Sequence, residues 1–386
     1  MGETINNAKR RSHGESRQAL ERSIGRKLDE EPLELEQFAD LHYARYAKDT
    51  KDVPRGTVLL LEGEEEPLRQ IAGFPHVPRT YRLARGVERA FGDRPFHVEE
   101  KIDGYNVRLA CTEGRVLALT RGGFVCPVTT EWAELWQENA GLGAFFADHP
   151  YWVICAEVIG DNPYNAQRDP RLPPGLHLRI FDIRDASGHV QRVTDRYKLI
   201  DRYELPSVPR LGVYTSDQME RLYDLLRSLN SEHREGVVLK HANGRQTLKF
   251  VTPMTELSDI VDNVPIAFDV GHPYFTNRIF RVLAFVRELG LDEEHYSYLL
   301  GRAFMDGYRE VEQESEARVE FTVYCRRWES WEAVAGQIGS AVDVERIKID
   351  EAEIDGHRMH RITFGRYYRK STRRFDRMLS GHGHVD

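Results

Sequence analysis

The pattern of hydrophobic and polar residues predicts strands in the middle of the chain. Between about residues 96 and 252, apolar residues alternate with polar ones or form short runs that end at turn residues. We expect a tight turn at Asp103-Gly104 between two strands, and helices at 131–137 and 217–229. Further strands are expected at 115–120, 152–159, 178–183, 236–240 and 247–251. The pattern therefore indicates an α+β fold that is rich in antiparallel sheet.

The parts before and after this region contain more residues at helical spacing. Apolar residues at 20–28 and 33–46 predict helices, and a buried strand is expected at 56–62. An irregular connector follows at 73–79. From about 255 to 313 the spacing predicts three helices, whose broad apolar faces suit packing either within the chain or against a partner chain.

The last part of the chain returns to a mixture of strands and helices. A strand is expected at 318–326 and a helix at 328–338, followed by a hairpin around Asp355-Gly356 and a helix at 371–379. Eight Lys or Arg residues lie between Arg358 and Arg377, interleaved with the aromatic residues Phe364, Tyr367, Tyr368 and Phe375. Such a segment suits single-stranded nucleic acid, and it equally suits the solvated face of a small domain.

Composition and charge narrow the class of protein. With 386 residues, 40% of them hydrophobic and 30% charged, the chain is long enough for two or three globular domains. A net charge of −8 means that any nucleic-acid site has to be a local basic patch. We find no signal peptide and no apolar run of about 18 residues, so we expect a cytoplasmic protein without a membrane partner. Neither metal-finger spacing nor a disulfide pattern relates the cysteines, which are Cys111, Cys126, Cys155 and Cys325.

The first candidate for chemistry is Lys101, which lies just before the expected turn. A lysine with an ordinary pKa near 10.4 is almost entirely protonated at neutral pH, so it is a poor nucleophile. Burial or neighbouring cations can lower that pKa and expose the lone pair of the amine. Taken alone, a Lys-x-Asp-Gly run is common, and it fits a surface lysine beside a hairpin.

Several short stretches after Lys101 give this lysine a context. A cation stands at a glycine turn, a carboxylate stands among apolar strand residues, an aromatic residue lies in a strand, and two later strands carry lysines. In chain order these stretches are Thr120-Arg121-Gly122-Gly123, Cys155-Ala156-Glu157, Phe181-Asp182-Ile183, Glu235 to Lys240, and Leu248-Lys249-Phe250.

This ordered set resembles the motifs of the covalent nucleotidyltransferase superfamily, which comprises ATP-dependent DNA and RNA ligases and messenger-RNA capping enzymes. The run that begins at Lys101 resembles motif I, and Thr120 to Gly123 resembles motif Ia. The stretches at Phe181, at Glu235 to Lys240 and at Lys249 resemble motifs III, IV and V. The resemblance covers about residues 96 to 252.

A closer resemblance is to the homodimeric, archaeal-type ATP-dependent RNA ligases, the third RNA ligase family. Asn106 and Arg108 follow the Lys-Ile-Asp-Gly run, and Thr-Arg-Gly-Gly replaces the Ser-Arg-Asn-Gly of many DNA ligases. The helical segment and small last domain, without an obvious OB-fold, match that family over nearly the whole chain. The first 60 residues match least well.

The resemblance implies four domains. They are a mostly helical N-terminal extension (1–65), an antiparallel-rich nucleotidyltransferase domain of the ATP-grasp-like ligase adenylation type (66–254), a helical dimerisation domain (255–314) and a small α+β C-terminal domain (315–386).

The resemblance also implies roles for single residues. Lys101 would attack the α-phosphorus of ATP, release pyrophosphate and become lysyl-AMP. Lys240 and Lys249 would hold the α-phosphate oxygens and lower the pKa of Lys101 by like-charge repulsion. Glu235 would bind Mg²⁺ or Mn²⁺, while Asp103 would either touch the metal or hold Lys101 by a charge pair.

The remaining implied roles concern ATP and the RNA end. Phe181 would stack on adenine, and Glu99 would place adenine through its main chain. Glu157 would bind ribose hydroxyls. The ribose or the incoming 5′-phosphate would be contacted by Asn106, Arg108 and Arg121. The bland alternatives are core packing for Phe181, a structural salt bridge for Glu157 and solvated strand ends for the lysines.

The expected function is ATP-dependent joining or circularisation of single-stranded RNA that carries 5′-phosphate and 3′-hydroxyl ends, by a homodimer. One alternative keeps the fold and changes the substrate, as in a DNA ligase or a capping enzyme. Another is a dimeric protein that binds RNA ends without catalysis.

Overall fold

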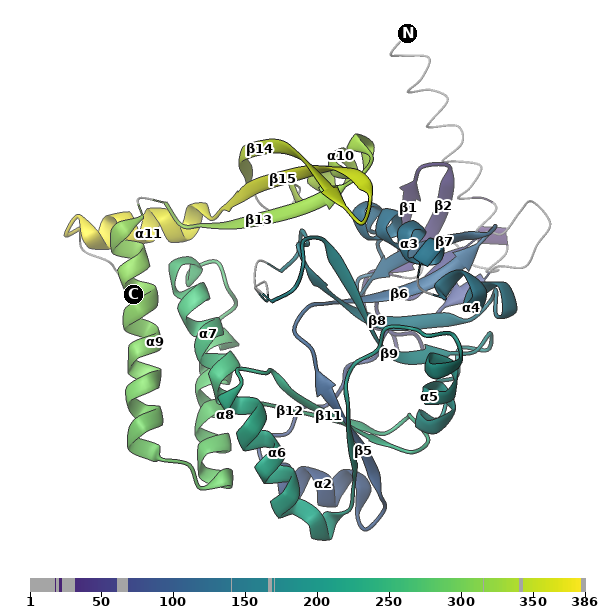
Figure 1. Cartoon of the computed structure of the whole chain (residues 1–386). Coiled ribbons are helices and arrows are strands. Elements are labelled where there is room, and N and C mark those ends of the chain that lie inside the picture. Colours follow the sequence, from purple (N-terminus) through teal and green to yellow (C-terminus); the bar gives the residue numbers. More distant parts are fainter. Residues whose placement is uncertain are drawn as a thin grey trace.

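The computed structural model describes residues 18, 21–22, 32–60, 69–139, 141–165, 169, 171–314, 316–339 and 343–382. In this part of the chain, helices and antiparallel sheets are combined as the sequence predicts (Figure 1). None of the helices in it combines the length and the apolar character needed to cross a bilayer.

Two four-stranded sheets form the centre of the molecule. The first has the order β10-β5-β11-β12, and its strands are β5 (Phe96–Lys101), β10 (Arg210–Tyr214), β11 (Gly236–His241) and β12 (Thr247–Val251). The second has the order β7-β6-β8-β9, and its strands are β6 (Tyr105–Thr112), β7 (Arg115–Thr120), β8 (Val153–Gly160) and β9 (Leu176–Arg184). The strands predicted between residues 115 and 251 are therefore confirmed.

Helices cover each central sheet with apolar side chains. Helices α2 (Leu83–Phe91) and α6 (Met219–Ser231) share a core with the first sheet, and α6 follows a short 3-10 helix at Ser216–Gln218. Helices α3 (Pro127–Asn139) and α4 (Leu142–Asp148) share a core with the second sheet. A further helix, α5 (Val193–Arg202), follows β9.

The tight turn predicted at Asp103-Gly104 is wrong. Strand β5 pairs with β10 and β11, whereas β6 pairs with β7 and β8, so the residues between them cross from one sheet to the other. A Cβ atom on Gly104 would lie 2.4 Å from the carbonyl oxygen of Val158, so glycine is needed there for close packing against β8. Lys101 consequently lies at the junction of the two sheets.

The helix predicted at 33–46 is also wrong. This stretch forms an antiparallel hairpin of β1 (Leu33–Phe38) and β2 (Leu41–Tyr46), which continues into β3 (Val58–Leu60) and β4 (Arg69–Ile71). Leu33 and Leu35 alternate with glutamates, and this period of two fits a strand better than a helix. The strand expected at 56–62 is confirmed at Val58–Leu60, with residues 61 and 62 outside the described residues, and the irregular connector at 73–79 is confirmed.

The N-terminal sheet packs on the second central sheet. Tyr43 and Leu60 share a buried cluster with Ala110 and Leu119. The expectation of a mostly helical extension is therefore wrong for residues 32–60, and the helix expected at 20–28 lies outside the described residues except for 21 and 22. The division into four domains stays a prediction.

The helical segment agrees with the sequence pattern. Its helices are α7 (Pro253–Asn263), α8 (Pro273–Leu289) and α9 (Glu293–Gln313), with a 3-10 turn at Val264–Ile266. Asp292 caps α9, because its side chain accepts hydrogen bonds from the amides of Glu294 and His295. Phe285 of α8 stacks on Phe250 of β12 at 5.2 Å, so the segment is attached to the first central sheet.

The C-terminal part forms a three-stranded sheet with two helices. The elements are β13 (Arg318–Cys325), α10 (Trp328–Gly339), β14 (Asp343–Ile354), β15 (His357–Tyr367) and α11 (Arg369–Leu379). The predicted hairpin is confirmed, since Asp355 and Gly356 both have positive φ, as its turn requires. Phe364 and Phe375 are buried, so the interpretation of these two residues as base-stacking aromatics is wrong.

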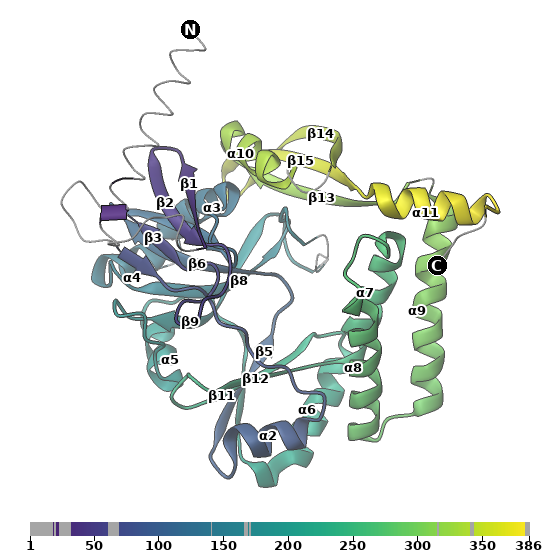
Figure 2. The same ribbon diagram turned by 180° about the vertical axis from the view of Figure 1, so that it is seen from behind.

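This C-terminal part contacts α3, which covers the second central sheet, and also the helical segment (Figure 1, Figure 2). The buried carboxylate of Glu131 on α3 accepts hydrogen bonds from the amide of Arg327, at 3.0 Å, and the hydroxyl of Ser330, at 2.8 Å. At the other end, the hydroxyl of Ser371 donates to Asp269, which follows α7, at 2.6 Å. The C-terminal part thus spans from the second central sheet to the helical segment.

Candidate active site

A cavity between the two central sheets contains most of the predicted site residues. Its walls come from β5, β6, β8, β9, β11 and β12 and from the connector before α2, which supplies Phe74, Pro75 and Val77. The predicted residues that line it are Glu99, Lys101, Asn106, Arg121, Glu157, Phe181, Lys240 and Lys249. The sheet junction thus brings together stretches that are far apart in the sequence.

Lys101 reaches the cavity from the end of β5. Its Nζ atom lies 2.5 Å from Oε1 of Glu235, and 19% of its side chain is exposed, so the amine is enclosed but reachable. The register aligns Lys101 with Gly236, the residue after Glu235. Gly236 has a φ of 142°, and a Cβ atom there would lie 2.2 Å from the carbonyl oxygen of Phe250. The glycine therefore lets three strands pack closely where lysine and glutamate meet.

The charge around Lys101 differs from the expectation. Burial alone would lower the pKa of this amine, but the nearby carboxylates, chiefly Glu235 and Glu157, outweigh burial and raise the pKa above its ordinary value. The expected net lowering of the Lys101 pKa is therefore not found in the protein without ligands, although Lys249 and Lys101 do repel each other. The predicted charge pair between Lys101 and Asp103 acts in the same direction as the other carboxylates.

The acidic side chains around this lysine have raised pKa values. Burial raises the pKa of Glu157 to about 8, and the negative charges of Glu235 and Asp103 add to this effect. Asp103 is exposed as a whole residue, but protein atoms crowd its carboxyl group. This local burial, together with Glu235, raises the pKa of Asp103 to about 7. At neutral pH, Glu157 therefore holds a proton in the protein without ligands.

Cations form another part of the cavity. Burial lowers the pKa of Lys249 to about 8, and the positive charges of Arg79 and Lys101 act in the same direction. Arg121 lines the cavity from an exposed position, where a guanidinium nitrogen lies 2.9 Å from Nδ1 of His76. Cations that are held close together against their mutual repulsion suit the binding of a polyanion.

Phe181 lies in the wall of the cavity. Its ring meets that of Phe74 edge to face, with 5.2 Å between the ring centroids. Phe181 is only partly buried and lines the cavity, so its ring can contact a planar ligand there.

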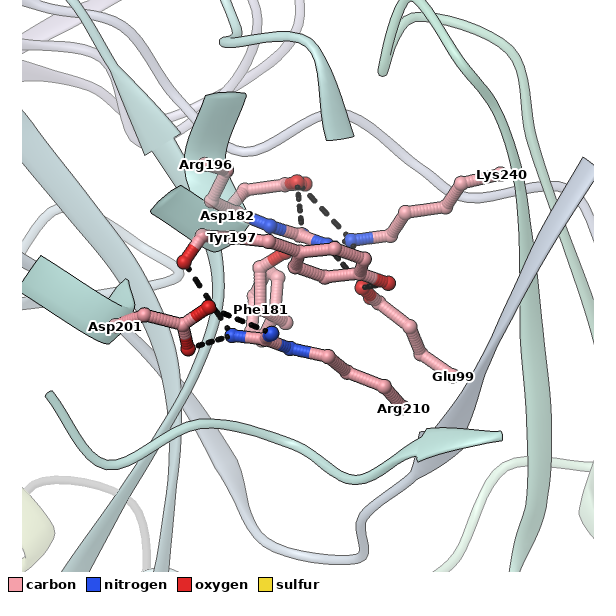
Figure 3. Close-up of polar contacts among 8 residues, drawn as sticks. All are labelled: Glu99, Phe181, Asp182, Arg196, Tyr197, Asp201, Arg210 and Lys240. Carbon is pink, nitrogen blue, oxygen red and sulfur yellow. Dashed lines mark hydrogen bonds and ion pairs between the residues drawn. The ribbon is translucent and has the colours of Figure 1, made fainter. Parts of the chain in front are cut away.

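Lys240 is engaged with protein groups rather than free for phosphate (Figure 3). Its Nζ atom donates to the carbonyl oxygen of Phe181 at 2.6 Å and to Oδ1 of Asp182 at 3.0 Å, and it lies 3.1 Å from Oε2 of Glu99. An ammonium group has three N–H donors, and here two hydrogen bonds and an ion pair with Glu99 hold it. The predicted contact of Lys240 with an α-phosphate oxygen therefore stays a prediction, and it would require this ammonium to exchange a protein partner for phosphate.

The side chain of Glu99 is likewise held by protein groups. It pairs with Arg196, and the hydroxyl of Tyr197 donates to its Oε1 atom at 2.7 Å (Figure 3). The pairs with Arg196 and Lys240 lower the pKa of Glu99 despite its burial, which acts in the opposite direction and is the largest single effect.

Arg108 has a structural position. It is fully buried, and its guanidinium group donates to the carbonyl oxygens of Ala72, Gly56 and Thr120 at 2.8 to 2.9 Å. It does not line the cavity, so the predicted contact with ribose or the RNA phosphate is wrong. By contrast, the Oδ1 atom of Asn106 is buried at the cavity without a hydrogen-bond partner in the described structure.

The predicted metal ligands fit a divalent cation only in part. Oε2 of Glu235 is buried and has no hydrogen-bond partner in the described structure, which leaves it available to a hard cation. Among the described residues, however, no three or more His, Cys, Asp or Glu side chains are gathered as a metal site would require. A cation here would need oxygens of the substrate as further ligands.

Three side chains of this region were not identified from the sequence. Asp182 directly follows Phe181, Arg196 comes from α5, and Phe74 comes from the irregular connector. A charged residue within an otherwise apolar strand or helix is the one sequence signal that could have pointed to Asp182 and Arg196.

Comparisons with known proteins agree with this geometry. A sequence model described as RNA ligase matches residues 94–251. An uncharacterized protein of Methanocaldococcus jannaschii is 29% identical over 269 residues, which are 68% of this chain and 65% of that protein. The match thus spans less than two thirds of that relative's length.

Solved structures resemble the chain over nearly its whole length. Two forms of an archaeal ATP-dependent RNA ligase are 30% and 31% identical, each with a TM-score of 0.79 and coverage of 92% of this chain and 95% and 94% of theirs. A provisionally assigned ATP-dependent DNA ligase of Aquifex aeolicus is 31% identical, with a TM-score of 0.80 and coverage of 93% of this chain and 98% of that one. The likeness therefore extends well beyond residues 94–251.

Proposed function

The chain belongs to the family of archaeal-type ATP-dependent RNA ligases, and from this membership we propose that it joins RNA ends through an AMP group carried on Lys101. The observation that carries the proposal is the position of the Lys101 amine, in the same cavity as an accessible aromatic ring and the cations Lys249 and Arg121. A base, a triphosphate and a nucleophile can meet there.

The proposed reaction has three steps. First, the Lys101 nitrogen forms a bond to the α-phosphorus of ATP, and the bond from that phosphorus to pyrophosphate breaks. Second, an RNA 5′-phosphate oxygen takes the AMP group from Lys101. Third, an RNA 3′-hydroxyl attacks the activated phosphate, AMP leaves, and a phosphodiester bond remains. The ends can belong to two strands or to one.

The residues of the cavity support this chemistry. The Lys101 ammonium has to lose a proton before it attacks, and Oε1 of Glu235, 2.5 Å away, is the acceptor within reach. Lys249 binds phosphate oxygens, and Arg121, being exposed, binds the RNA 5′-phosphate. Oε2 of Glu235 takes a divalent cation, Mg²⁺ or Mn²⁺, which supplies charge neutralisation for phosphate oxygens.

The nucleoside occupies the other part of the cavity. Phe181 stacks on adenine, and the main chain at Glu99 reads the edge of the base. Glu157 and Asn106 bind the ribose hydroxyls, since the protonated Glu157 carboxyl can both donate and accept, and Oδ1 of Asn106 lacks a partner in the described structure.

We further propose that the protein is a homodimer that works in the cytoplasm. Helices α8 and α9 expose large apolar side chains to solvent, among them Phe280 at 58% and Tyr298 at 63%, and a second copy of the chain would cover them. The free and buried thiols of Cys126 and Cys155 suit a reducing compartment. A monomer mass in light scattering at micromolar concentration would contradict the dimer, and Phe280→Glu should convert a dimer into monomers.

Labelling with ATP radioactive at the α-phosphate tests the central claim. We expect wild-type protein to accept an acid-labile label from ATP and not from GTP, and Lys101→Ala to accept none. Lys198→Ala is the matched control, because Lys198 is exposed on α5 and pairs only with Asp195 within the described structure. An unlabelled wild type, or a labelled Lys101→Ala, would refute the proposal.

The acceptor is tested in the same assay. We expect single-stranded RNA with a 5′-phosphate to be joined or circularised. Sealing of nicked duplex DNA without action on RNA would instead favour a DNA ligase, which is how the similar Aquifex aeolicus protein is provisionally assigned.

A further inference from the structure

Four buried charged side chains join the two central sheets beside the cavity (Figure 3). Glu99 on β5 and Lys240 on β11 belong to the first sheet, whereas Asp182 on β9 belongs to the second. Arg196, on α5, contacts a carboxylate of each sheet: it pairs with Glu99, and its Nη1 atom donates to Oδ1 of Asp182 at 3.0 Å. The two sheets are thus linked here by ion pairs rather than by strand pairing.

This cluster has little freedom to move. Each of the four residues is buried, and Arg196 is only 1% exposed. Two carboxylates face two cations, so the net charge is zero and no charge remains uncompensated. Charges taken out of water are stable only when their partners are held in good geometry, so removal of one partner is costly. The cluster therefore fixes the relative position of the strands that carry it.

The fixed position bears on the wall of the cavity. Lys240 also donates to the carbonyl oxygen of Phe181, at 2.6 Å, which holds the backbone of the residue whose ring faces the cavity. Val238, two residues before Lys240 on β11, lines the same cavity. One apolar side chain from each sheet therefore contributes to the wall, and Glu99, Asp182 and Lys240 of the ion cluster line the same cavity.

We propose that Arg196 is a positioning residue that sets the separation of Phe181 and Val238, and thereby the affinity of the cavity for the adenine of ATP. This inference rests on the proposed function, because it takes ATP as the ligand. The cations Lys249 and Arg121 lie outside the ion cluster and have no hydrogen bond or ion pair with it in the described part of the chain, so binding of the triphosphate part is expected to be independent of Arg196.

The proposal separates two kinds of ligand. ATP needs both the base wall and the phosphate cations, whereas inorganic tripolyphosphate needs only the cations. We would measure the rate of lysyl-AMP formation over a range of ATP concentrations, and the inhibition of that reaction by tripolyphosphate, in full-length wild-type protein, Arg196→Met and Arg196→Lys.

In Arg196→Met we expect the ATP concentration at half-maximal rate to rise about tenfold, because a buried carboxylate on each sheet loses one of its partners and only Lys240 still links the two. The maximal rate and the inhibition by tripolyphosphate should each stay within about twofold, since neither depends on the base wall. Arg196→Lys keeps the charge but has a single ammonium in place of two guanidinium arms, so it should restore only part of the ATP affinity.

Arg210→Met is the matched control. Arg210 stacks on Tyr197, an aromatic neighbour of the cluster, with 4.1 Å from the guanidinium carbon to the ring centroid. It also forms an ion pair with Asp201 at 2.6 Å. It has no direct hydrogen bond or ion pair with Glu99 or Asp182 in the described structure, so its ATP dependence should equal that of the wild type.

The outcomes distinguish this inference from the function on which it rests. An unlabelled wild type refutes the proposed function, and ATP binding measured by calorimetry then decides the role of Arg196. A labelled wild type with an unchanged ATP dependence in both Arg196 variants overturns the inference alone. Equal losses of ATP and tripolyphosphate affinity also overturn it, because they indicate a general disturbance. If circular dichroism shows that Arg196→Met is unfolded, the Arg196→Lys result decides.

Discussion

Two side chains of the cavity titrate near neutral pH and carry opposite charges when ionised. Lys249 and Glu157 both have a pKa of about 8, and burial is the largest cause for each of them. Below this pH the lysine is charged and the carboxyl group is neutral. Above this pH the lysine loses its positive charge and Glu157 gains a negative charge. Both changes make the net charge of the cavity more negative.

We therefore expect the affinity for ATP to fall as the pH rises above about 8. A bound triphosphate stabilises the protonated form of Lys249, so binding takes up a proton and weakens by up to about tenfold per pH unit above the pKa of the free protein. Calorimetric titration with ATP between pH 7 and 9.5 measures this slope. Lys249→Arg should flatten it, since arginine stays charged, and a slope unchanged in that variant would contradict the role of Lys249.

Glu157 makes the folded protein less stable at neutral and alkaline pH. Its pKa rises from 4.5 in the unfolded chain to about 8 in the folded protein. Between these values the unfolded chain releases the proton while the folded protein holds it, so stability falls as the pH rises from about 4.5 to 8 and then levels off. Glu157→Gln should remove this loss.

In Glu157→Gln we expect the free energy of unfolding at pH 8 to increase by roughly 1–3 kcal/mol, with an advantage that shrinks toward pH 5. Melting curves of both proteins at several pH values measure the effect. A variant that is less stable than the wild type at pH 8 would show that Glu157 is held as a charged partner instead.

The sequence predicted which residues gather at the site better than it predicted their charge state. Lys101, Phe181 and Lys249 could be found because each lies in a short motif with a fixed order. The pKa of Lys101 could not be predicted in this way. It depends on carboxylates from three separate places in the chain: the crossing between β5 and β6, strand β8, and the residue before β11. Arg196 lies on a helix outside every motif, and only the folded chain brings it to the cluster.

At the scale of elements, periodicity is reliable where it is long. The three helices between residues 255 and 313 carry several turns of apolar spacing, and all three were predicted. The stretch at 33–46 is short enough to fit two periods, and strand alternation prevails. Asp103-Gly104 is a turn signal by composition alone, because the sequence does not show that the strands on its two sides pair with different neighbours.

The crossing between the sheets makes Gly104 sensitive to substitution. A Cβ atom would lie 2.4 Å from the carbonyl oxygen of Val158 and 2.7 Å from Cγ2 of Ile159, so Gly104→Ala must push β8 away. We expect a loss of about 1–3 kcal/mol in stability, together with slower lysyl-AMP formation because Lys101 ends the preceding strand.

Gly301→Ala is the control for this substitution. Gly301 lies within α9, and a Cβ atom there meets no atom within 4 Å, so alanine should stabilise the helix by about 0.5–1 kcal/mol. Thermal melting and the labelling assay compare the two variants. A Gly104→Ala protein with normal melting and normal labelling would contradict the requirement for glycine.

At the scale of the whole molecule, the region that matches the RNA ligase sequence model is surrounded by other parts of the chain. The sheet of β1 to β4 shares a core with the second central sheet, and α8 packs on the first. The C-terminal part contacts α3 at one end and the segment after α7 at the other. The sequence predicted each of these parts as a separate unit, because contacts between distant parts leave no periodic signal.

The contacts of Glu131 set a limit on how the protein can be shortened. Within the described structure, the partners of its buried carboxylate lie just before and at the start of α10, among them the amide of Arg327 and the hydroxyl of Ser330. A fragment that stops at Glu314 would keep the negative charge and lose every one of these donors. We expect such a fragment to aggregate on expression, as measured by sedimentation, whereas a monodisperse fragment that melts cooperatively would prove us wrong. We therefore expect that the two central sheets fold stably only when the chain also contains its last seventy residues or so.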